Sequence, residues 1–182
     1  MRVIAGDARG TKLETLPGEE VTRPTIDRVK EAMFSALQFS LPGARVLDLF
    51  AGSGQLGIEA ISRGAASCVF LDRDRRAVEI ITRNCKAAGV FDRARVAQGE
   101  AEGFLAATKD TFHIVLLDPP YHQGTLAAIL PAVADVTAPG GVVLCESELA
   151  ADLPDECGGL HKKKQYRYGK VLVTRYEKER AE

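Results

Sequence analysis

The residues best suited to chemistry lie at positions 118–121, where an aspartate is followed by two prolines and a tyrosine. They come directly after the apolar run 113–117, which predicts a place at the carboxyl edge of a parallel sheet. Two prolines remove two amide donors and fix the backbone, so this rim is rich in acceptors. Asp118 and the bare carbonyls suit an exocyclic NH2 group, because they can hold its hydrogens, aim its lone pair at a methyl donor and accept its proton. Tyr121 would stack on the base, and a plain turn is the alternative interpretation.

A second pattern, at residues 48–57, reads Asp-Leu-Phe-Ala-Gly-Ser-Gly-Gln-Leu-Gly between a strand-like and a helix-like segment. Gly52, Gly54 and Gly57 match the G-x-G-x-x-G spacing that lets a nucleoside ligand approach a helix N-terminus. Asp72 lies 20 residues after Gly52, at the end of the next apolar run, where its carboxylate can accept both ribose hydroxyls. The pattern alone does not separate a dinucleotide from S-adenosylmethionine, and a tight turn without a ligand stays open.

Asp48 favours a sulfonium cofactor over a dinucleotide. A carboxylate four residues before the first glycine would repel a pyrophosphate, but it could bind the ammonium group of S-adenosylmethionine directly or through water. A strand-end aspartate that the protein itself satisfies is the alternative.

A parallel α/β sheet would bring these segments together. Short apolar runs, β-branched and with little polar alternation, read as strands covered on both faces. They lie at residues 45–49, 68–71, 113–117 and 141–145, with a weaker run at 94–97. Helical periodicity fills the intervals, which predicts right-handed βαβ units.

The two ends of the chain differ from this middle part. Residues 1–24 predict a small β-hairpin extension, with strands near residues 2–5 and 11–16, ahead of a main domain at residues 25–182. A second hairpin around Gly169 is expected to pair antiparallel at the sheet edge.

Composition and charge exclude several protein classes. The 182 residues are 46% hydrophobic and 27% charged, with a net charge of −1, which indicates one globular domain rather than a disordered or uniformly basic chain. No apolar run reaches the ~18 residues of a membrane span. Four cysteines without a CxxC pair and three scattered histidines predict no metal site. We therefore expect a cytoplasmic, metal-free protein, and a monomer.

A basic segment is hidden in this near-neutral total. Residues 157–176 carry six Lys or Arg and no Asp or Glu, interleaved with tyrosines, a mix suited to phosphate contacts and base stacking. The predicted RNA-binding residues, here and near the N-terminus, are Arg2, Arg9, Lys12, Arg23, Arg28, Lys162, Lys163, Lys164 and Arg167. A solvated edge hairpin whose lysines block strand addition is the alternative, and Arg28 and Lys30 could equally pair with Asp27 and Glu31.

Three stretches, residues 23–31, 48–57 and 118–121, together resemble class I S-adenosylmethionine-dependent amino-methyltransferases. More narrowly, they resemble the bacterial family that methylates a guanine N2 of 16S rRNA in the small ribosomal subunit. The tail around residues 168–170 fits as well, so the resemblance covers essentially the whole chain. It implies a Rossmann-like fold with a mostly parallel seven-stranded sheet, helices on both faces and an antiparallel C-terminal strand.

The motifs and the resemblance together give a set of expected site residues. The catalytic residues are Asp118, Pro119 and Tyr121. The residues expected to bind S-adenosylmethionine are Asp48, Phe50, Ala51, Gly52, Ser53, Gly54, Asp72, Arg73, Glu100, Ala101 and Asp118. Two positions depart from the family pattern, because Asp72 stands where many relatives carry Glu and Glu100 replaces the usual Asp beside the adenine.

The leading prediction is methyl transfer from S-adenosylmethionine to guanine N2 in 16S rRNA, within an assembling or assembled small subunit. Adenine N6 and a glutamine amide present a similar NH2 group and stay open. A nicotinamide-dependent oxidoreductase does not explain the donor-poor rim at residues 118–121. An RNA-binding protein without activity is a further alternative.

Overall fold

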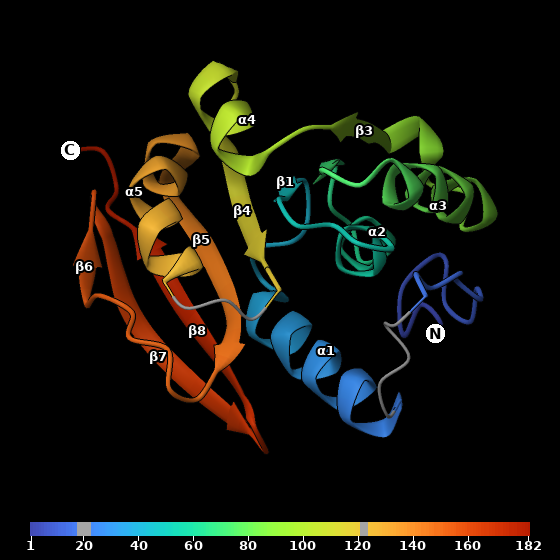
Figure 1. The fold of residues 1–182 in the computed structure, drawn as a ribbon, viewed down its shortest axis with the longest axis horizontal. Coiled ribbons are helices and arrows are strands. Elements are labelled where there is room, and N and C mark those ends of the chain that lie inside the picture. Colours follow the sequence, from blue (N-terminus) through green and yellow to red (C-terminus); the bar gives the residue numbers. More distant parts are fainter. Residues whose placement is uncertain (18–22, 121–123) are drawn as a thin grey trace.

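The computed structural model describes residues 1–17, 23–120 and 124–182, so the predicted base-stacking Tyr121 lies outside the described residues. Within them the chain forms one mixed sheet with helices on both faces (Figure 1). The strands are β1 (Arg45–Asp48), β2 (Ser67–Asp72), β3 (Ala94–Gln98), β4 (Phe112–Leu117), β5 (Thr137–Glu148), β6 (Glu156–Cys157), β7 (Leu160–Tyr168) and β8 (Val171–Lys178). The helices are α1 (Arg23–Leu37), α2 (Gln55–Ser62), α3 (Arg75–Ala87), α4 (Ala101–Ala107) and α5 (Thr125–Val136), with a 3-10 turn η1 (Phe91–Arg93).

The strand order in the described part is β3-β2-β1-β4-β5-β8-β7-β6. The first five strands are parallel, and β8, β7 and β6 continue the sheet antiparallel. The structure thus adds an eighth strand to the predicted seven, because the two-residue β6 pairs with the start of β7. The chain order reverses between β1 and β4, and open α/β sheets bind ligands at the carboxyl ends of strands at such a point.

Two hydrophobic clusters, one on each face, hold the layers together. Buried side chains of α1, α2 and α3 pack on one face, and those of α4 and α5 pack on the other. Alternation along β1 shows why both faces are covered, since Val46 belongs to the first cluster and Leu47 to the second, and both are fully buried. The prediction that runs without polar alternation form parallel strands covered on both faces is therefore confirmed.

The N-terminal hairpin is shorter than predicted, and no full strands form at residues 2–5 and 11–16. An isolated antiparallel bridge joins Arg2 and Lys12, and the N–H groups of Val3, Gly10 and Leu13 donate to the carbonyls of Thr11, Val3 and Met1. The backbone donors that would extend a hairpin are bound to α2 instead. The N–H groups of Ile4 and Ala5 donate to the two carboxylate oxygens of Glu59, at 2.8 and 3.0 Å. The segment is therefore anchored on α2 beyond the short pairing at its start.

The C-terminal hairpin forms as predicted, with Gly169 in the left-handed region at φ 58°. The register of β7 against β8 shifts between Lys162 and Lys164, which makes Lys163 the extra residue of a β-bulge. The bulge reverses the alternation of side chains, so Lys164 lies on the opposite face from Lys162.

Candidate active site

A cavity of about 1020 Å³ opens at the carboxyl ends of the parallel strands. Eight of the predicted site residues line it: Phe50, Gly52, Asp72, Arg73, Glu100, Ala101, Asp118 and Pro119. They come from the ends of β1, β2, β3 and β4, so the sheet brings together residues that are far apart in the chain. The volume is that of a site for a nucleoside-sized ligand.

The glycine loop adopts the backbone that its sequence predicts. Gly52 and Gly54 have φ of 57° and 82°, and Gly54 is the N-cap of α2. The third glycine has a different reason, because a Cβ on Gly57 would lie 2.3 Å from the Phe70 ring. Gly57 thus serves close packing of α2 on β2, while Gly52 borders the cavity.

Asp72 is fixed between the glycine loop and the start of α3. Its Oδ2 accepts from the Gly52 N–H at 2.9 Å, and its Oδ1 accepts from the Asp74 N–H at 2.9 Å. Each carboxylate oxygen has a second lone pair, so acceptor capacity remains for the hydroxyls of a ligand. The side chain is half-buried at the cavity wall.

Asp48 lies behind the glycine loop, not on the cavity wall. Its side chain is 1% exposed, and its Oδ2 accepts from the Gly57 N–H at 3.0 Å. Its Oδ1 has no hydrogen-bond partner among the described residues. Burial raises the pKa of Asp48 to about 7, against the opposing effect of the Gly57 hydrogen bond. This geometry favours the interpretation as a strand-end aspartate that caps the first turn of α2.

Three further loop residues expected at the cofactor do not line the cavity: Ala51, Ser53 and Gly54. All three are buried, and Ser53 faces inward, since its carbonyl accepts from the Asn84 side-chain amide at 2.8 Å. Phe50, Gly52 and Gln55 therefore line the cavity, whereas Ser53 is turned toward α3.

The described part of the rim after β4, residues 118–120, lies on the cavity. Asp118 is half-buried, Pro119 buried and Pro120 exposed, and all three line the cavity. Glu146, at the end of β5, joins them, and a side-chain hydrogen bond links it to Asp118. The rim thus carries two carboxyl groups next to two residues that have no backbone N–H.

Sequence reasoning missed Glu146, although one signal could have found it. The rule that ligands bind at the carboxyl ends of parallel strands applies to the run 141–145 as well as to 113–117. Glu146 follows the first run as Asp118 follows the second. The missing information was that β4 and β5 are neighbours, which only the topology gives.

The described wall of the cavity is strongly acidic. Its carboxylates are Asp72, Asp74, Glu100, Glu102, Asp118 and Glu146, and its cations are Lys30 and Arg73. The cation of Lys30 is already engaged, because its Nζ lies 3.2 Å from Glu59 and 3.1 Å from the Arg2 carbonyl. A wall of this charge attracts a cationic ligand and repels a pyrophosphate.

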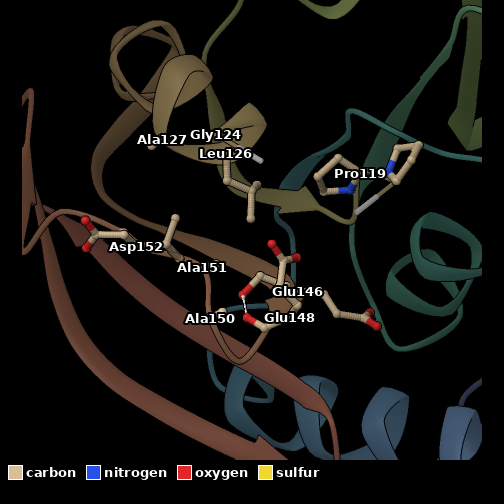
Figure 2. A pocket seen from close by; sticks show the side chains of 12 residues that line it. Pro119, Gly124, Leu126, Ala127, Glu146, Glu148, Ala150, Ala151 and Asp152 are labelled. Carbon is tan, nitrogen blue, oxygen red and sulfur yellow. Dashed lines mark hydrogen bonds between the residues drawn. The ribbon is translucent and has the colours of Figure 1, made fainter. Parts of the chain in front are cut away.

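A smaller cavity of about 250 Å³ adjoins the large one (Figure 2). Pro119, Pro120 and Glu146 line both, and the end of β5 with residues 150–153 forms the far wall. Figure 2 shows Glu146 between Pro119 on one side and Leu126 and Ala151 on the other.

The predicted RNA-binding residues fall into two groups. Arg2, Arg9, Lys12, Arg28, Lys163, Lys164 and Arg167 are exposed, and Arg23 begins α1 with its side chain outside the described part. Lys162 differs, because its Nζ donates to the Leu153 carbonyl at 2.9 Å and lies 3.1 Å from Asp155. Lys30 forms a structural ion pair, as the alternative interpretation expected, but its partner is Glu59 and not Glu31.

Among the described residues, no group of three or more His, Cys, Asp or Glu side chains is placed to hold a metal ion. The helices of that same part of the chain are too short or too polar to cross a membrane.

Known proteins resemble this chain over its whole length. Residues 1–177 match the family described as conserved hypothetical protein 95. A Bacillus subtilis relative, named as a candidate rRNA methyltransferase YlbH, is 39% identical over 183 residues, covering 98% of this chain and 99% of the relative. The ribosomal RNA small subunit methyltransferase D of Escherichia coli K12 is 35% identical over 183 residues, covering 98% and 90%.

Among solved structures, a candidate methyltransferase from Escherichia coli, yhhF, matches with a TM-score of 0.86 at 33% identity, covering 100% of this chain and 99% of that one. These likenesses confirm the predicted Rossmann-like methyltransferase fold and the resemblance drawn from the three motifs. With the glycine loop, Asp72 and the proline rim on one cavity, the chain belongs to the methyltransferase family described as conserved hypothetical protein 95.

Proposed function

We propose that this chain transfers a methyl group from S-adenosylmethionine to the exocyclic N2 of a guanine in 16S rRNA. The observation that carries the proposal is the meeting of Gly52, Asp72 and the Asp118–proline rim on one cavity. The name of the Escherichia coli relative, a small-subunit rRNA methyltransferase, supports the choice of RNA.

The cavity fits S-adenosylmethionine by its charge and by one buried acceptor. Its acidic wall suits a sulfonium and an ammonium group. Gln55, at the first turn of α2, lines the cavity, and its Oε1 is buried without a partner among the described residues, so it can accept from an ammonium group. Asp72 would bind the ribose, and Glu100 and Ala101 would flank the adenine. Asp48 would hold the glycine loop in place through Gly57.

The reaction needs little more than orientation and a proton acceptor. The bound cofactor supplies a methyl group on a positively charged sulfur. Asp118 and the carbonyls of the rim hold the amine hydrogens, which directs the nitrogen lone pair at the methyl carbon. The methyl donor would pass its methyl group to the nitrogen and leave as the neutral thioether, with the electron pair of the broken C–S bond on sulfur. Asp118 then takes the proton that the nitrogen loses.

The RNA would approach along the β7–β8 hairpin. Beyond the bulge, Lys164, Tyr166 and Tyr168 share one face, and both tyrosines pack at the edge of the cluster that includes α1. Val171, opposite Tyr168 in the hairpin, lines the large cavity. This face therefore leads from exposed cations and aromatic rings to the site, as single-stranded RNA binding requires.

The proposal has finer parts. The extension at residues 1–24 adds Arg2, Arg9 and Lys12 to the RNA-binding face of the main domain at residues 25–182. The presented RNA is that of an assembling or assembled small subunit in the cytoplasm, and the enzyme acts as a monomer.

The test is transfer of labelled methyl groups onto small subunits from cells that lack this activity, followed by nucleoside analysis. We expect label in N2-methylguanosine, at one nucleotide that RNA mapping then identifies. Label in N6-methyladenosine, or in ribosomal protein alone, would refute the guanine assignment. Calorimetry with S-adenosylmethionine and with NAD tests the cofactor separately, and tighter binding of NAD would refute it.

A further inference from the structure

Glu146 lies beside Asp118 because β4 and β5 are parallel and in matched register. Leu117 pairs with Cys145, and the residues that follow them are Asp118, directly after β4, and Glu146, within β5; both line the large cavity. The side-chain hydrogen bond between the two carboxyl groups agrees with that placement. Burial raises the pKa of Glu146, and the hydrogen bond with Asp118 opposes the rise. Two carboxyl groups are thus held side by side at the reactive rim.

Glu146 also stands where the two cavities meet. It lines both, together with Pro119 and Pro120, and Figure 2 shows it in the middle of the smaller one. Neither proline has an N–H group, so this part of the wall combines two carboxyl groups with backbone that only accepts. The hydrogen bond between the two carboxyl groups needs one shared proton. Once both groups are ionised they only accept, so a ligand edge that rests here must supply two hydrogen-bond donors next to each other.

The four RNA bases differ in this respect. The pairing edge of guanine carries two adjacent donors, the ring N1–H and the N2 amine. Adenine and cytosine each place an amine next to a ring nitrogen that accepts, and uracil places one N–H between two carbonyl oxygens. Enzymes that act on a base taken out of its stack read this edge by hydrogen bonds. Two neighbouring acceptors therefore match guanine alone.

We propose that Glu146 is the residue that selects guanine, by accepting a hydrogen bond from the ring N1–H while Asp118 accepts from the N2 amine. The inference rests on the proposed function and adds the group that recognises the base. Adenine or cytosine in the same position would set the lone pair of a ring nitrogen against the Glu146 carboxylate. Both would be rejected, because a buried acceptor would face another acceptor.

The experiment compares guanine with 2-aminopurine at the nucleotide identified by the transfer assay, in subunits reconstituted with synthetic RNA. 2-Aminopurine keeps the reactive amine but has a lone pair at N1 in place of the hydrogen. We expect the wild-type enzyme to prefer guanine by at least about 100-fold in kcat/KM. In Glu146→Gln the amide can donate to that lone pair. The rate on guanine should fall by about 10-fold or more, and the preference should shrink by at least about 10-fold.

Matched variants separate recognition from folding. Glu148→Gln changes a carboxylate of the same strand that lines the small cavity but not the large one, and it should leave the preference unchanged. Glu146→Asp keeps a carboxylate and should keep the preference for guanine at a lower rate. If Glu146→Gln left the ratio of kcat/KM on guanine to that on 2-aminopurine unchanged, whether or not both rates fell, the role of Glu146 would be refuted. A wild-type enzyme that methylates no guanine would instead refute the proposed function itself.

Discussion

Two neighbouring strands, β1 and β4, each lead to an aspartate at the same edge of the sheet, and the two side chains have opposite fates. Asp48 is 1% exposed and accepts a backbone N–H from the first turn of α2. Asp118 is half-buried, lines the large cavity and is hydrogen-bonded to Glu146. Equivalent places in a sheet therefore do not give equivalent roles.

The loop after each strand explains the difference. After β1 the chain turns through two left-handed glycines and presents helix N–H groups to Asp48. After β4 two prolines have no N–H to offer, so the adjacent backbone cannot cap Asp118. The first carboxylate is enclosed and holds the loop through one oxygen, whereas the second lies on the cavity wall.

The largest expected effect is on chemistry at Asp118. Asp118→Ala should lower kcat by about 10²–10⁴-fold, because the variant loses its proton acceptor and one holder of the amine. Calorimetry should show S-adenosylmethionine binding within a few-fold of wild type. The control is Asp110→Ala, an exposed aspartate before β4 whose ion pair with Arg95 is long, at 3.9 Å, and it should keep full activity. Normal turnover in Asp118→Ala would contradict the catalytic role that distinguishes Asp118 from Asp48.

A substitution at the third glycine of the loop should change the stability of the protein. Gly57→Ala would press a Cβ onto the Phe70 ring, and we expect it to lower the free energy of unfolding by about 2–3 kcal/mol. Gly103→Ala, in α4 with no neighbour within 4 Å, should instead stabilise the protein by about 0.5–1 kcal/mol. Chemical denaturation of both variants checks the pair. A neutral Gly57→Ala would mean that α2 does not depend on this close approach.

The burial of Asp48 should make the free energy of unfolding depend on pH. Its pKa is about 7 in the folded protein against an ordinary 3.8, so the folded state holds the proton more tightly. Stability is therefore lost as the pH rises through this window. Asp48→Asn does not titrate, so its stability relative to wild type should improve by about 2 kcal/mol between about pH 5.5 and pH 8. Denaturation curves at both pH values measure the difference, and a constant difference would show that Asp48 is not the cause.

The smallest effect concerns the hairpin, where neighbouring lysines differ as the two aspartates do. If about four phosphates are neutralised, log K for RNA should fall with log salt at a slope near −3. The double change Lys163→Ala and Lys164→Ala should make that slope shallower by about 1.4, since both side chains are exposed. Lys162→Ala should leave the slope within about 0.3 and lower stability, because its Nζ is bound to Leu153 and Asp155. A flat plot for the wild type would refute the electrostatic interpretation.

Much of the fold and of the site could be predicted because local chemistry determines it. The left-handed glycines, the proline rim and the β-branched runs act within a few residues of themselves, so Gly52, Asp72 and Pro119 are found where the sequence puts them. Local chemistry did not predict how short the pairing between residues 2–5 and 11–16 would be. The N–H groups of Ile4 and Ala5 donate instead to Glu59, which lies more than 50 residues further along the chain.

By itself the sequence determined which segments turn, which strands are buried and which loops can meet a cofactor, because backbone freedom and side-chain polarity are properties of the residues themselves. Tertiary structure alone decided that Asp48 is enclosed, that Lys162 is engaged, and that Glu146 stands next to Asp118. Those three outcomes depend on which strands become neighbours and what covers them. Burial and pairing arise between distant parts of the chain, and no local pattern records them.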